Sequence, residues 1–331
     1  MNRRVLFLLA VLLPGLPFTL LAADADTPTK LQRYEANASI MGSTYTIAAF
    51  GEHRGQLASA VRAAFDEARR IDRFLSNYKP DSELSRINRE ASDGPIEISS
   101  EMADLLTNCL EYSHASEGAF DVTVGALMKV WGFYKGSGEL PYAWQLAVAR
   151  RKVGFEHLVL DRGKKTIHIR RRGLELDPGG IGKGYAVDRM AEVLREAGVS
   201  AAFISAAGSS LYGIGAPPDN PEGWPVRIRD PEDSAATATK LHLKDQSLST
   251  SGAYEKFFEA DGKVYSHIMD PRTGMPSQGV VSVSVLAPST LDSEAWTKAF
   301  FVNGWDWSVK NKPDAFRAFL CSEDQPCNWI R

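Results

Sequence analysis

Hydrophobic residues recur at helical intervals in four segments of the chain. Residues 56–75 show the pattern most fully, with apolar side chains at Leu57, Val61, Phe65, Ala68 and Ile71. The same periodicity predicts helices over residues 100–114, 184–197 and 293–302. Gly198 and Gly304 follow the last two of these segments, and glycine is the usual residue just beyond a helix C-terminus. The chain is therefore expected to contain amphipathic helices, each with one buried face.

A second set of segments has the composition and alternation of β-strands. The predicted strands cover residues 39–50, 157–160, 166–170, 226–229, 241–243 and 280–286. The second and third of these are expected to form a hairpin that turns at Gly163. Because strands and helices do not alternate strictly, the pattern favours an α+β arrangement over a doubly wound parallel sheet. The polar loop 216–224 is the best candidate for a long insertion.

The N-terminus has the parts of a secretory signal. Arg3 and Arg4 precede an apolar run over residues 5–21, and alanines at 22, 23 and 25 offer cleavage points. Two prolines interrupt the run, which argues against a permanent membrane-spanning helix. No cysteine follows the run, so a lipoprotein is not expected. The sequence thus predicts a signal peptide over residues 1–25 and an exported, periplasmic domain over residues 26–331.

Composition changes this picture little. The chain has 331 residues, of which 44% are hydrophobic and 24% charged, and its net charge is −3. This charge gives no support to a nucleic-acid partner, and the three arginines at residues 170–172 are interpreted as a solvated strand end. The spacing of the three cysteines does not match a zinc site. Cys109 is predicted to be a core thiol, whereas Cys321 and Cys327 could close a small loop, and their oxidation state stays open.

The most informative motif is the sequence HIMDPRTGMP at residues 267–276. It places an imidazole (His267), a carboxylate (Asp270) and a guanidinium (Arg272) within six positions. A proline fixes φ and a glycine admits positive φ, so these polar groups are expected on a bent, defined backbone. The combination indicates a site for phosphate or another anion.

A glycine-rich segment, DPGGIGKGYAVD at residues 177–188, leads into a predicted helix. Glycines allow the backbone to approach a ligand closely, and the helix N-terminus offers free N–H groups to an anion. Lys183 adds a positive charge. The segment is neither a Walker A loop nor a G-x-G-x-x-G fingerprint. A plain glycine-rich turn between a strand and a helix explains it equally well.

Several aromatic and apolar positions admit two interpretations. In GAFDVTVG at residues 118–125, Phe120 could stack on a planar ring while Asp121 accepts a hydrogen bond. Core aromatics with an aspartate in a turn are the simpler explanation. Met41 and Tyr78 lie in weaker motifs and are, on their own, interpreted as core residues.

Taken together, these segments resemble the FAD:protein FMN transferases, the ApbE-type flavin transferases. Seven pieces occur in the order of that family: MGSTYTI, LSNYKPDSELSRIN, GAFDVTVGALMKVWGF, LDPGGIGKGYAVDR, AAGSSLYGIG, STSGAYEKFF and HIMDPRTGMP. With the helix that ends at Gly304, they span roughly residues 41–304, which is nearly the whole mature chain. The resemblance implies an α+β fold with a T-fold-like core of mixed sheets packed with helices, in a single compact enzyme domain.

The resemblance also implies an activity. Members of the family cleave FAD and attach FMN through a phosphoester bond to a threonine of a partner protein, with release of AMP. They usually need a divalent metal, commonly Mg²⁺. The expected acceptor is an exported redox protein, and the resemblance allows a peripheral contact with the membrane. Two alternatives stay open: a non-catalytic FAD-binding homologue that stores or presents flavin, and a pyrophosphatase that gives FMN and AMP.

Individual residues take their expected roles from the same resemblance. The expected FAD-binding residues are Met41, Tyr78, Ala119, Phe120, Asp121, Asp177, Lys183, His267 and Ile268. The expected metal ligands are Gly180, through its carbonyl, and Glu294. The expected catalytic residues are His267, Arg272 and Lys298. Within the 267–276 motif, Asp270, Arg272 and Thr273 are expected to brace the loop, and Arg272 also to reach a phosphate.

The last motif departs from the family pattern. The family has a helix with an Asp and, four residues later, a Thr or Ser that hold the metal. Counting back from Gly304 puts Glu294 and Lys298 there, and a protonated lysine repels a metal ion. The other alignment uses Asp292 and Thr297, which point about 140° apart at ~100° per residue. We therefore expect a metal site that is weakened or replaced by Lys298, with an ordinary Glu–Lys helix pair as the alternative.

Overall fold

The computed structural model describes residues 31–330, with Ser234 excepted. The predicted signal peptide at residues 1–25 therefore lies outside the described residues. From Leu31 onward the chain forms one structural unit. No helix in this described part is long and apolar enough to cross a bilayer.

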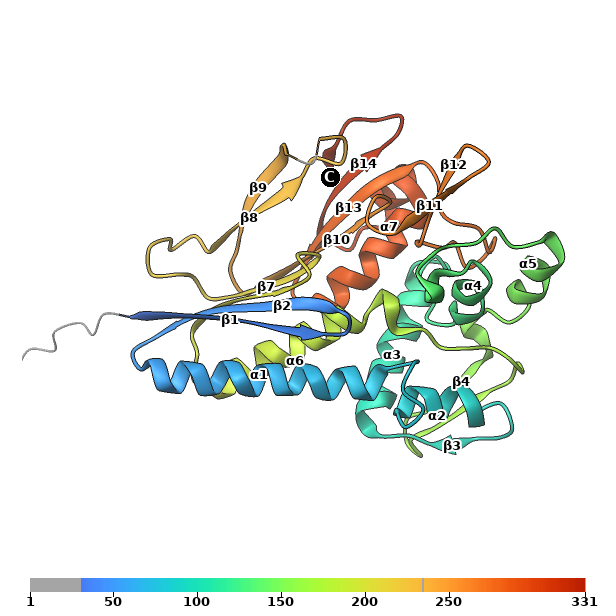
Figure 1. Cartoon of the computed structure of the whole chain (residues 1–331), viewed down its shortest axis with the longest axis horizontal. Coiled ribbons are helices and arrows are strands. Elements are labelled where there is room, and N and C mark those ends of the chain that lie inside the picture. The colour runs from blue at the N-terminus through green and yellow to red at the C-terminus, as the bar shows by residue number, and fades with distance from the viewer. Residues whose placement is uncertain (1–30, 234, 331) are drawn as a thin grey trace, which may run out of the picture. The chain divides into compact units, whose positions relative to one another are not determined.

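An eight-stranded sheet is the centre of the structure (Figure 1). In spatial order its strands are β1 (Gln32–Ile40), β2 (Ser43–Gly51), β6 (Ala201–Ala206), β7 (Ser210–Ile214), β10 (Gln246–Gly252), β13 (Val280–Ala287), β14 (Arg317–Ser322) and β15 (Asn328–Ile330). Every ladder between these strands is antiparallel, which corrects the predicted mixed sheets. Short turns join several of the neighbouring strands, and a short turn permits only antiparallel pairing. The α+β class is confirmed, and the T-fold-like description stays a prediction.

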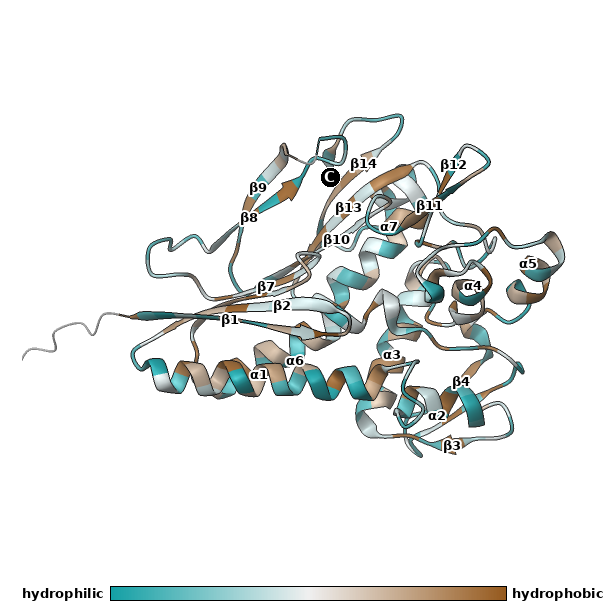
Figure 2. Cartoon of the chain, viewed as in Figure 1, coloured by the Kyte–Doolittle hydropathy of each residue, from teal (hydrophilic) through white to brown (hydrophobic). Residues whose placement is uncertain are grey.

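Both faces of the sheet are covered. Three helices pack on one face: α1 (Arg54–Leu75), α6 (Gly182–Glu196) and α7 (Thr290–Asn311). The hairpin of β8 (Trp224–Arg229) and β9 (Thr237–Leu243) packs on the other face. Within β2, Ile47 and Ala49 face the helices while Ala48 faces the hairpin. Strand β13 has seven of its eight residues buried and is apolar except at Ser282 and Ser284, and the apolar residues appear as brown stretches of its ribbon in Figure 2.

The long predicted helices are present. They correspond to α1, to α3 (Ser100–Ala115), to α6 and to the first half of α7. In α7 the backbone leaves helical geometry at Gly304, where φ is 78°, and a further helical stretch then follows. The shorter helices were not predicted: α2 (Glu83–Glu90), α4 (Gly125–Val130) and α5 (Ala143–Arg150). Helices of six to eight residues contain too few apolar positions to reveal a helical period.

The predicted strands are confirmed with one correction. Residues 39–50 are not a single strand, because the chain turns at Met41 and Gly42 (φ 51° and 66°) from the end of β1 into β2. The predicted hairpin consists of β4 (Leu158–Asp161) and β5 (Thr166–Ile169), which extends to β3 (Ile96–Glu97). The predicted polar loop leads from β7 into β8. A separate hairpin, β11 (Phe257–Ala260) with β12 (Lys263–Ser266), was missed, as were β6, β7, β10, β14 and β15.

The cysteines take two different roles. Cys321, in β14, forms a disulfide with Cys327, which settles the question that the sequence left open. Cys109 is a free thiol on α3 and is fully buried, as predicted.

The contact between α6 and α7 can be tested at Gly184. A Cβ at this position would lie 2.5 Å from the carbonyl oxygen of Thr290 and 2.7 Å from Oε2 of Glu294, so the two helices would have to separate. We expect Gly184→Ala to lower the free energy of unfolding by about 1–3 kcal/mol, which is the usual cost of overpacking. Urea unfolding measures the change.

Gly55 provides the matched control, because it also lies in the first turn of a helix but a Cβ there would meet nothing within 4 Å. Gly55→Ala should leave stability unchanged or raise it slightly, since alanine favours the helix. Equal effects of the two substitutions would contradict the close packing of α6 on α7.

Candidate functional site

The 267–276 motif forms a closed loop between β12 and β13. The backbone N–H of Asp270 donates to Met275 O (2.9 Å), and the N–H of Gly274 donates to Asp270 O (2.8 Å). The Arg272 side chain donates through Nε to Asp270 Oδ1 (2.9 Å) and through Nη1 to Asn303 Oδ1 (2.8 Å). These contacts fit the expected bracing role of Arg272. They do not support its predicted reach to a phosphate, because two partners already hold the guanidinium.

His267 begins this loop and presents one ring nitrogen without a protein partner in the described residues. Its Nδ1 lies 3.1 Å from Lys256 O. A carbonyl oxygen only accepts, so Nδ1 carries the hydrogen and Nε2 keeps a lone pair. Burial lowers the pKa of His267 to about 4, and the nearby charges of Lys298, Lys256 and Lys183 act in the same direction. The imidazole is therefore neutral at neutral pH.

Two lysines from different helices are near enough to this imidazole for their charges to lower its pKa. Lys183, in the first turn of α6, donates to Ser209 Oγ (2.5 Å). Lys298, on α7, lies with its Nζ 3.8 Å from Glu294 Oε1. Burial lowers the pKa of Lys298 to about 8, the carboxylate of Glu294 opposes this shift, and Lys183 adds to it. The structure thus brings the predicted residues His267, Lys183 and Lys298 together in a positively charged site.

Glu294 is almost completely buried and is held from two sides. Its Oε2 accepts a hydrogen bond from the backbone N–H of Gly184, and its Oε1 faces Lys298. Within residues 31–330, leaving Ser234 aside, no three His, Cys, Asp or Glu side chains converge as a metal site. One carboxylate with an ammonium 3.8 Å away is a poor donor set for Mg²⁺, which prefers several oxygen ligands. The residues present do not fit the metal that the resemblance implies.

Asp292 and Thr297, the alternative pair of metal ligands, both have hydrogen-bond partners in the protein. Asp292 Oδ1 accepts from the Tyr112 hydroxyl (2.6 Å), and its Oδ2 accepts from Ser289 Oγ (2.6 Å). Thr297 Oγ1 lies 2.8 Å from Ser251 Oγ, within the contact between α7 and β10. The two side chains are committed to different neighbours, which agrees with the prediction that they do not share a metal ion.

Asp177 lies in a chain of polar contacts that the sequence did not reveal. The Tyr134 hydroxyl donates to Asp177 Oδ2 (2.7 Å) and accepts from Asn77 Nδ2 (2.9 Å). The adjacent Tyr78 ring meets the Tyr134 ring edge-on, with 5.7 Å between their centroids. Tyr78 is 72% exposed, so its interpretation as a core residue was wrong, and its ring is free to contact a ligand. Tyr134 directly follows the family piece GAFDVTVGALMKVWGF, but nothing in the sequence marked its hydroxyl.

The Ala119–Phe120–Asp121 segment is mostly structural. Ala119 and Phe120 are buried, and the Phe120 ring packs edge-on against Tyr112, with centroids 5.8 Å apart. Asp121 accepts from the backbone N–H groups of Thr123 (2.8 Å) and Phe155 (3.0 Å). The simpler explanation, core aromatics with an aspartate in a turn, is the one that these contacts support. Phe120 still lies close to the site, since a Cβ at Gly180 would be 3.3 Å from its ring.

The remaining predicted positions are placed as follows. Ile268 belongs to the core: its side chain is buried, and its carbonyl accepts from Ser277 N (2.8 Å). Met41 occupies the turn between β1 and β2, where its sulfur accepts from the Tyr45 hydroxyl (3.2 Å). Tyr45 is fully buried; burial raises the pKa of its hydroxyl, and Glu294 contributes next. The Tyr45 hydroxyl, which sequence reasoning missed, is thus the hydrogen-bond donor that holds Met41 at this turn.

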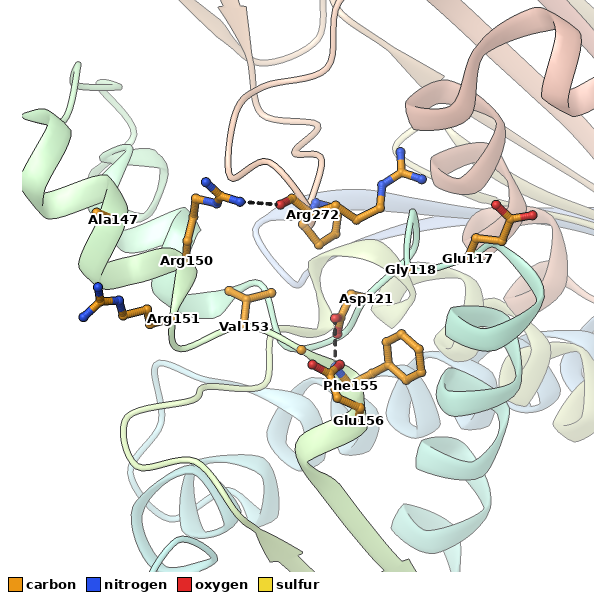
Figure 3. A pocket seen from close by; sticks show the side chains of 12 residues that line it. Glu117, Gly118, Asp121, Ala147, Arg150, Arg151, Val153, Phe155, Glu156 and Arg272 are labelled. Carbon is orange, nitrogen blue, oxygen red and sulfur yellow. Dashed lines mark hydrogen bonds between the residues drawn. The ribbon is translucent and has the colours of Figure 1, made fainter.

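A cavity of about 560 Å³ lies beside the loop (Figure 3). Asp121, Phe155, Arg150 and Arg272 are among its lining residues, and Arg150 donates to the Arg272 carbonyl (2.9 Å). His267 and Lys298 do not line it. The cavity therefore lies next to the lysine–histidine site and is separate from it.

These features define a class of protein: a mixed α+β domain in which two helices and a closed loop bring lysines and a histidine together. The chain belongs to the ApbE family, whose model matches residues 41–316. The FAD:protein FMN transferase of Salmonella typhimurium is 33% identical over 274 residues, which cover 80% of this chain and 77% of that protein. The corresponding protein of Escherichia coli K12 is 34% identical over 243 residues, covering 70% and 68%.

Solved structures agree with this assignment. The crystal structure of the ApbE protein from Thermotoga maritima superposes with a TM-score of 0.82 at 27% identity, covering 90% of this chain and 96% of that one. The apo form of the flavinyl transferase ApbE from Pseudomonas stutzeri gives a TM-score of 0.79 at 28% identity, covering 91% and 95%.

The structural role of Asp121 predicts a pH-dependent cost of mutation. Burial raises the pKa of Asp121 from 3.8 to about 6, although the N–H groups of Thr123 and Phe155 oppose the shift. A raised pKa means that the carboxyl contributes most to stability at low pH and loses that contribution as pH rises through about 6. We expect Asp121→Asn to cost less at about pH 7.5 than at about pH 4, by about 2–3 kcal/mol. Urea unfolding of both proteins at the two pH values measures this, and a cost independent of pH would contradict it.

Proposed function

We propose that this chain is an exported FAD:protein FMN transferase that attaches FMN through a phosphoester bond to a threonine of an acceptor protein and releases AMP. Its membership in the ApbE family and the names of its relatives support the activity. The structural observation that carries the proposal is the convergence of Lys183, Lys298 and a neutral His267. Positive charges held together in a half-buried site favour an anionic ligand, and FAD offers a diphosphate.

The proposed reaction is a phosphoryl transfer. The threonine oxygen of the acceptor forms a bond to the phosphorus of the FMN half. The bond between that phosphorus and the oxygen of the AMP half breaks, and AMP leaves with the electron pair. Negative charge develops on the phosphate oxygens during this step, so fixed ammonium groups lower the barrier.

His267 is the proposed acceptor of the proton that the threonine hydroxyl must lose. Its Nδ1–H is directed to Lys256 O, so Nε2 is the atom able to accept a proton. The low pKa of His267 keeps it neutral, and thus ready to accept, throughout the neutral range. The low pKa also makes the imidazole a weak base, so it takes the proton only as the new phosphorus–oxygen bond makes the hydroxyl acidic, and the imidazolium then releases the proton readily.

The proposed FAD contacts outside the phosphate site involve two groups. Tyr78 presents an exposed ring for stacking, and the Tyr134–Asp177 hydrogen bond fixes the polar edge beside it. Met41, in the turn between β1 and β2, is the other proposed contact. Ala119, Phe120 and Ile268 are proposed to shape the site from the core.

The proposal includes no metal step. The donor set around Glu294 does not fit Mg²⁺, and Gly180 offers at most one carbonyl. Lys298 instead supplies a fixed positive charge to the region that the resemblance gives to the ion. Lys183, in the first turn of α6, adds a second charge, and the N-terminus of that helix favours an anion.

A non-catalytic FAD-binding homologue is the second candidate, and the Glu294–Lys298 pair is the observation that favours it. A helical pair at i, i+4 partly neutralises Lys298 and leaves less charge for a reacting phosphate. Such a protein would bind FAD without transferring FMN.

Export is supported by one further feature. The Cys321–Cys327 disulfide suits an oxidising compartment, and periplasmic proteins can keep such a bond. The proposed acceptor is accordingly an exported redox protein with a threonine accessible to the site.

One incubation tests these functions. The purified chain is mixed with FAD and an acceptor protein carrying an exposed threonine, with Mg²⁺ and with a chelator in its place. Covalent FMN on the acceptor with equimolar AMP supports the transferase. Unchanged bound FAD supports the storage homologue, and free FMN with AMP supports a pyrophosphatase. A chain that binds no FAD under any of these conditions would overturn all three.

The role of Lys298 leads to a prediction about metal binding. Isothermal calorimetry in the presence of FAD should show no tight Mg²⁺ binding to the unmodified chain. The double variant Glu294→Asp, Lys298→Thr offers two oxygen ligands of the family type and should gain such binding. Lys298→Met, which removes the charge and adds no oxygen, is the matched control; it should gain no metal and should bind FAD about tenfold more weakly, because a charged partner contributes ~1.5–3 kcal/mol.

One calorimetric result would contradict this prediction. Tight, stoichiometric Mg²⁺ binding to the unmodified chain that is abolished by Glu294→Ala would show that the metal site is intact and that Lys298 does not replace it.

A further inference from the structure

Two basic runs that are separate in the sequence meet on one surface. Residues 150–152 (Arg, Arg, Lys) end α5, and residues 170–172 (three arginines) follow β5. Arg171 Nη1 donates to the Arg151 carbonyl (2.7 Å), and a Cβ at Gly173 would lie 3.2 Å from Cε of Lys152. The two runs, which together contain six cationic residues, therefore adjoin each other.

Most of this positive charge has no acidic partner. Arg172 pairs with Asp93 (3.1 Å). Across residues 31–330, apart from Ser234, no carboxylate lies within 4.0 Å of the charged nitrogens of the other five. A helix C-terminus favours cations, which accounts for the run at the end of α5. It does not account for Arg170 and Arg171, so the interpretation of 170–172 as a solvated strand end is incomplete.

Exposed aromatic and aliphatic side chains adjoin the basic runs. Tyr142 and Trp144 are 72% and 66% exposed, and Val148 is 47% exposed. Trp144, Val148 and Arg151 are spaced i, i+4 and i+7, which places them on one face of α5. Arg150 and Arg151 also line the cavity of Figure 3, where Arg150 donates to the Arg272 carbonyl.

We propose that this surface, which we call the α5 face (Tyr142, Trp144, Val148 and the runs 150–152 and 170–172), binds the anionic surface of a phospholipid bilayer. Tyrosine and tryptophan have an apolar body and a polar tip, and they settle at the level of the lipid headgroups. Clustered arginines and lysines beside them attract anionic headgroups. The large exposed fractions of both aromatic rings show that they project outward, which suits insertion between headgroups better than a contact that needs a matching pocket.

The proposal goes beyond the proposed transferase function and does not depend on it. It does have a consequence for that function. Arg150 connects the α5 face to the loop that carries His267, through its bond to the Arg272 carbonyl (2.9 Å). A chain held on a bilayer by this face would present its site close to acceptor proteins on the same membrane.

Vesicle flotation tests the proposal with the full mature chain. Vesicles of phosphatidylcholine mixed with phosphatidylglycerol should bind the chain, vesicles of phosphatidylcholine alone should not, and added salt should weaken binding. Arg151→Gln and Arg170→Gln should each lower the partition coefficient about fivefold, the equivalent of about 1 kcal/mol per basic residue. Trp144→Ser should lower it further. All three positions are exposed, so far-UV circular dichroism and FAD binding should stay unchanged.

Arg62→Gln on α1 and Val309→Ser on α7 are the matched controls, because both residues are exposed and lie outside the α5 face. They should leave vesicle binding unchanged. Equal binding to neutral and anionic vesicles, or equal effects of control and test variants, would overturn the proposal. Absence of vesicle binding together with cross-linking of an acidic acceptor protein at position 144 would identify a protein-docking face and would also overturn it.

Discussion

The site depends on a reciprocal contact between the N-terminal parts of α6 and α7. Asp188 of α6 accepts hydrogen bonds from the backbone N–H groups of Thr290 (2.7 Å) and Leu291 (2.8 Å) at the start of α7. Glu294 of α7 accepts from the N–H of Gly184 at the start of α6. Each helix thus satisfies free N–H groups of the other with a carboxylate, which the helix dipoles favour. Burial raises the pKa of Asp188 to about 6, and the two N–H groups of α7 limit that shift.

This contact fixes two positive charges that would otherwise separate. Lys183 lies one residue before Gly184, and Lys298 lies one turn after Glu294. Burial is the main cause of the lowered pKa of Lys298, and the charge of Lys183 adds to it, so the two ammonium groups repel each other. The hydrogen bonds between the two helices hold the lysines in place against this repulsion. A diphosphate placed between the lysines would offset their repulsion. Because the helices hold the two positive charges close together in the free protein, the site favours an anionic ligand.

The sequence predicted the long elements and the polar loop, but not the partners of individual side chains. The periodicity of α1 and the Pro–Gly loop at 267–276 are local properties, and local patterns identify them. Strand β10 escaped prediction because its serines are polar, yet Ser249 and Ser251 are buried against the hydroxyls of Ser293 and Thr297. Sequence patterns assign polar residues such as serine to the surface, and they cannot show that two hydroxyls will be buried together as hydrogen-bond partners. The Tyr134–Asp177 bond joins residues 43 positions apart and was invisible for the same reason.

A tethered ammonium changes the chemistry of the site and not only its charge. A divalent ion coordinates oxygen atoms of the ligand and of the protein at once, and it withdraws electrons from the phosphate that it binds. The ammonium of Lys298 donates hydrogen bonds and carries a single charge, part of which Glu294 balances at 3.8 Å. It therefore retains much of the attraction for a diphosphate in its ground state but less of the stabilisation specific to the transition state. Under the proposed function, FAD binding should tolerate the replacement of the metal ion by Lys298 better than FMN transfer does. The Glu294–Lys298 pair is therefore compatible both with a metal-independent transferase and with a protein that only holds flavin.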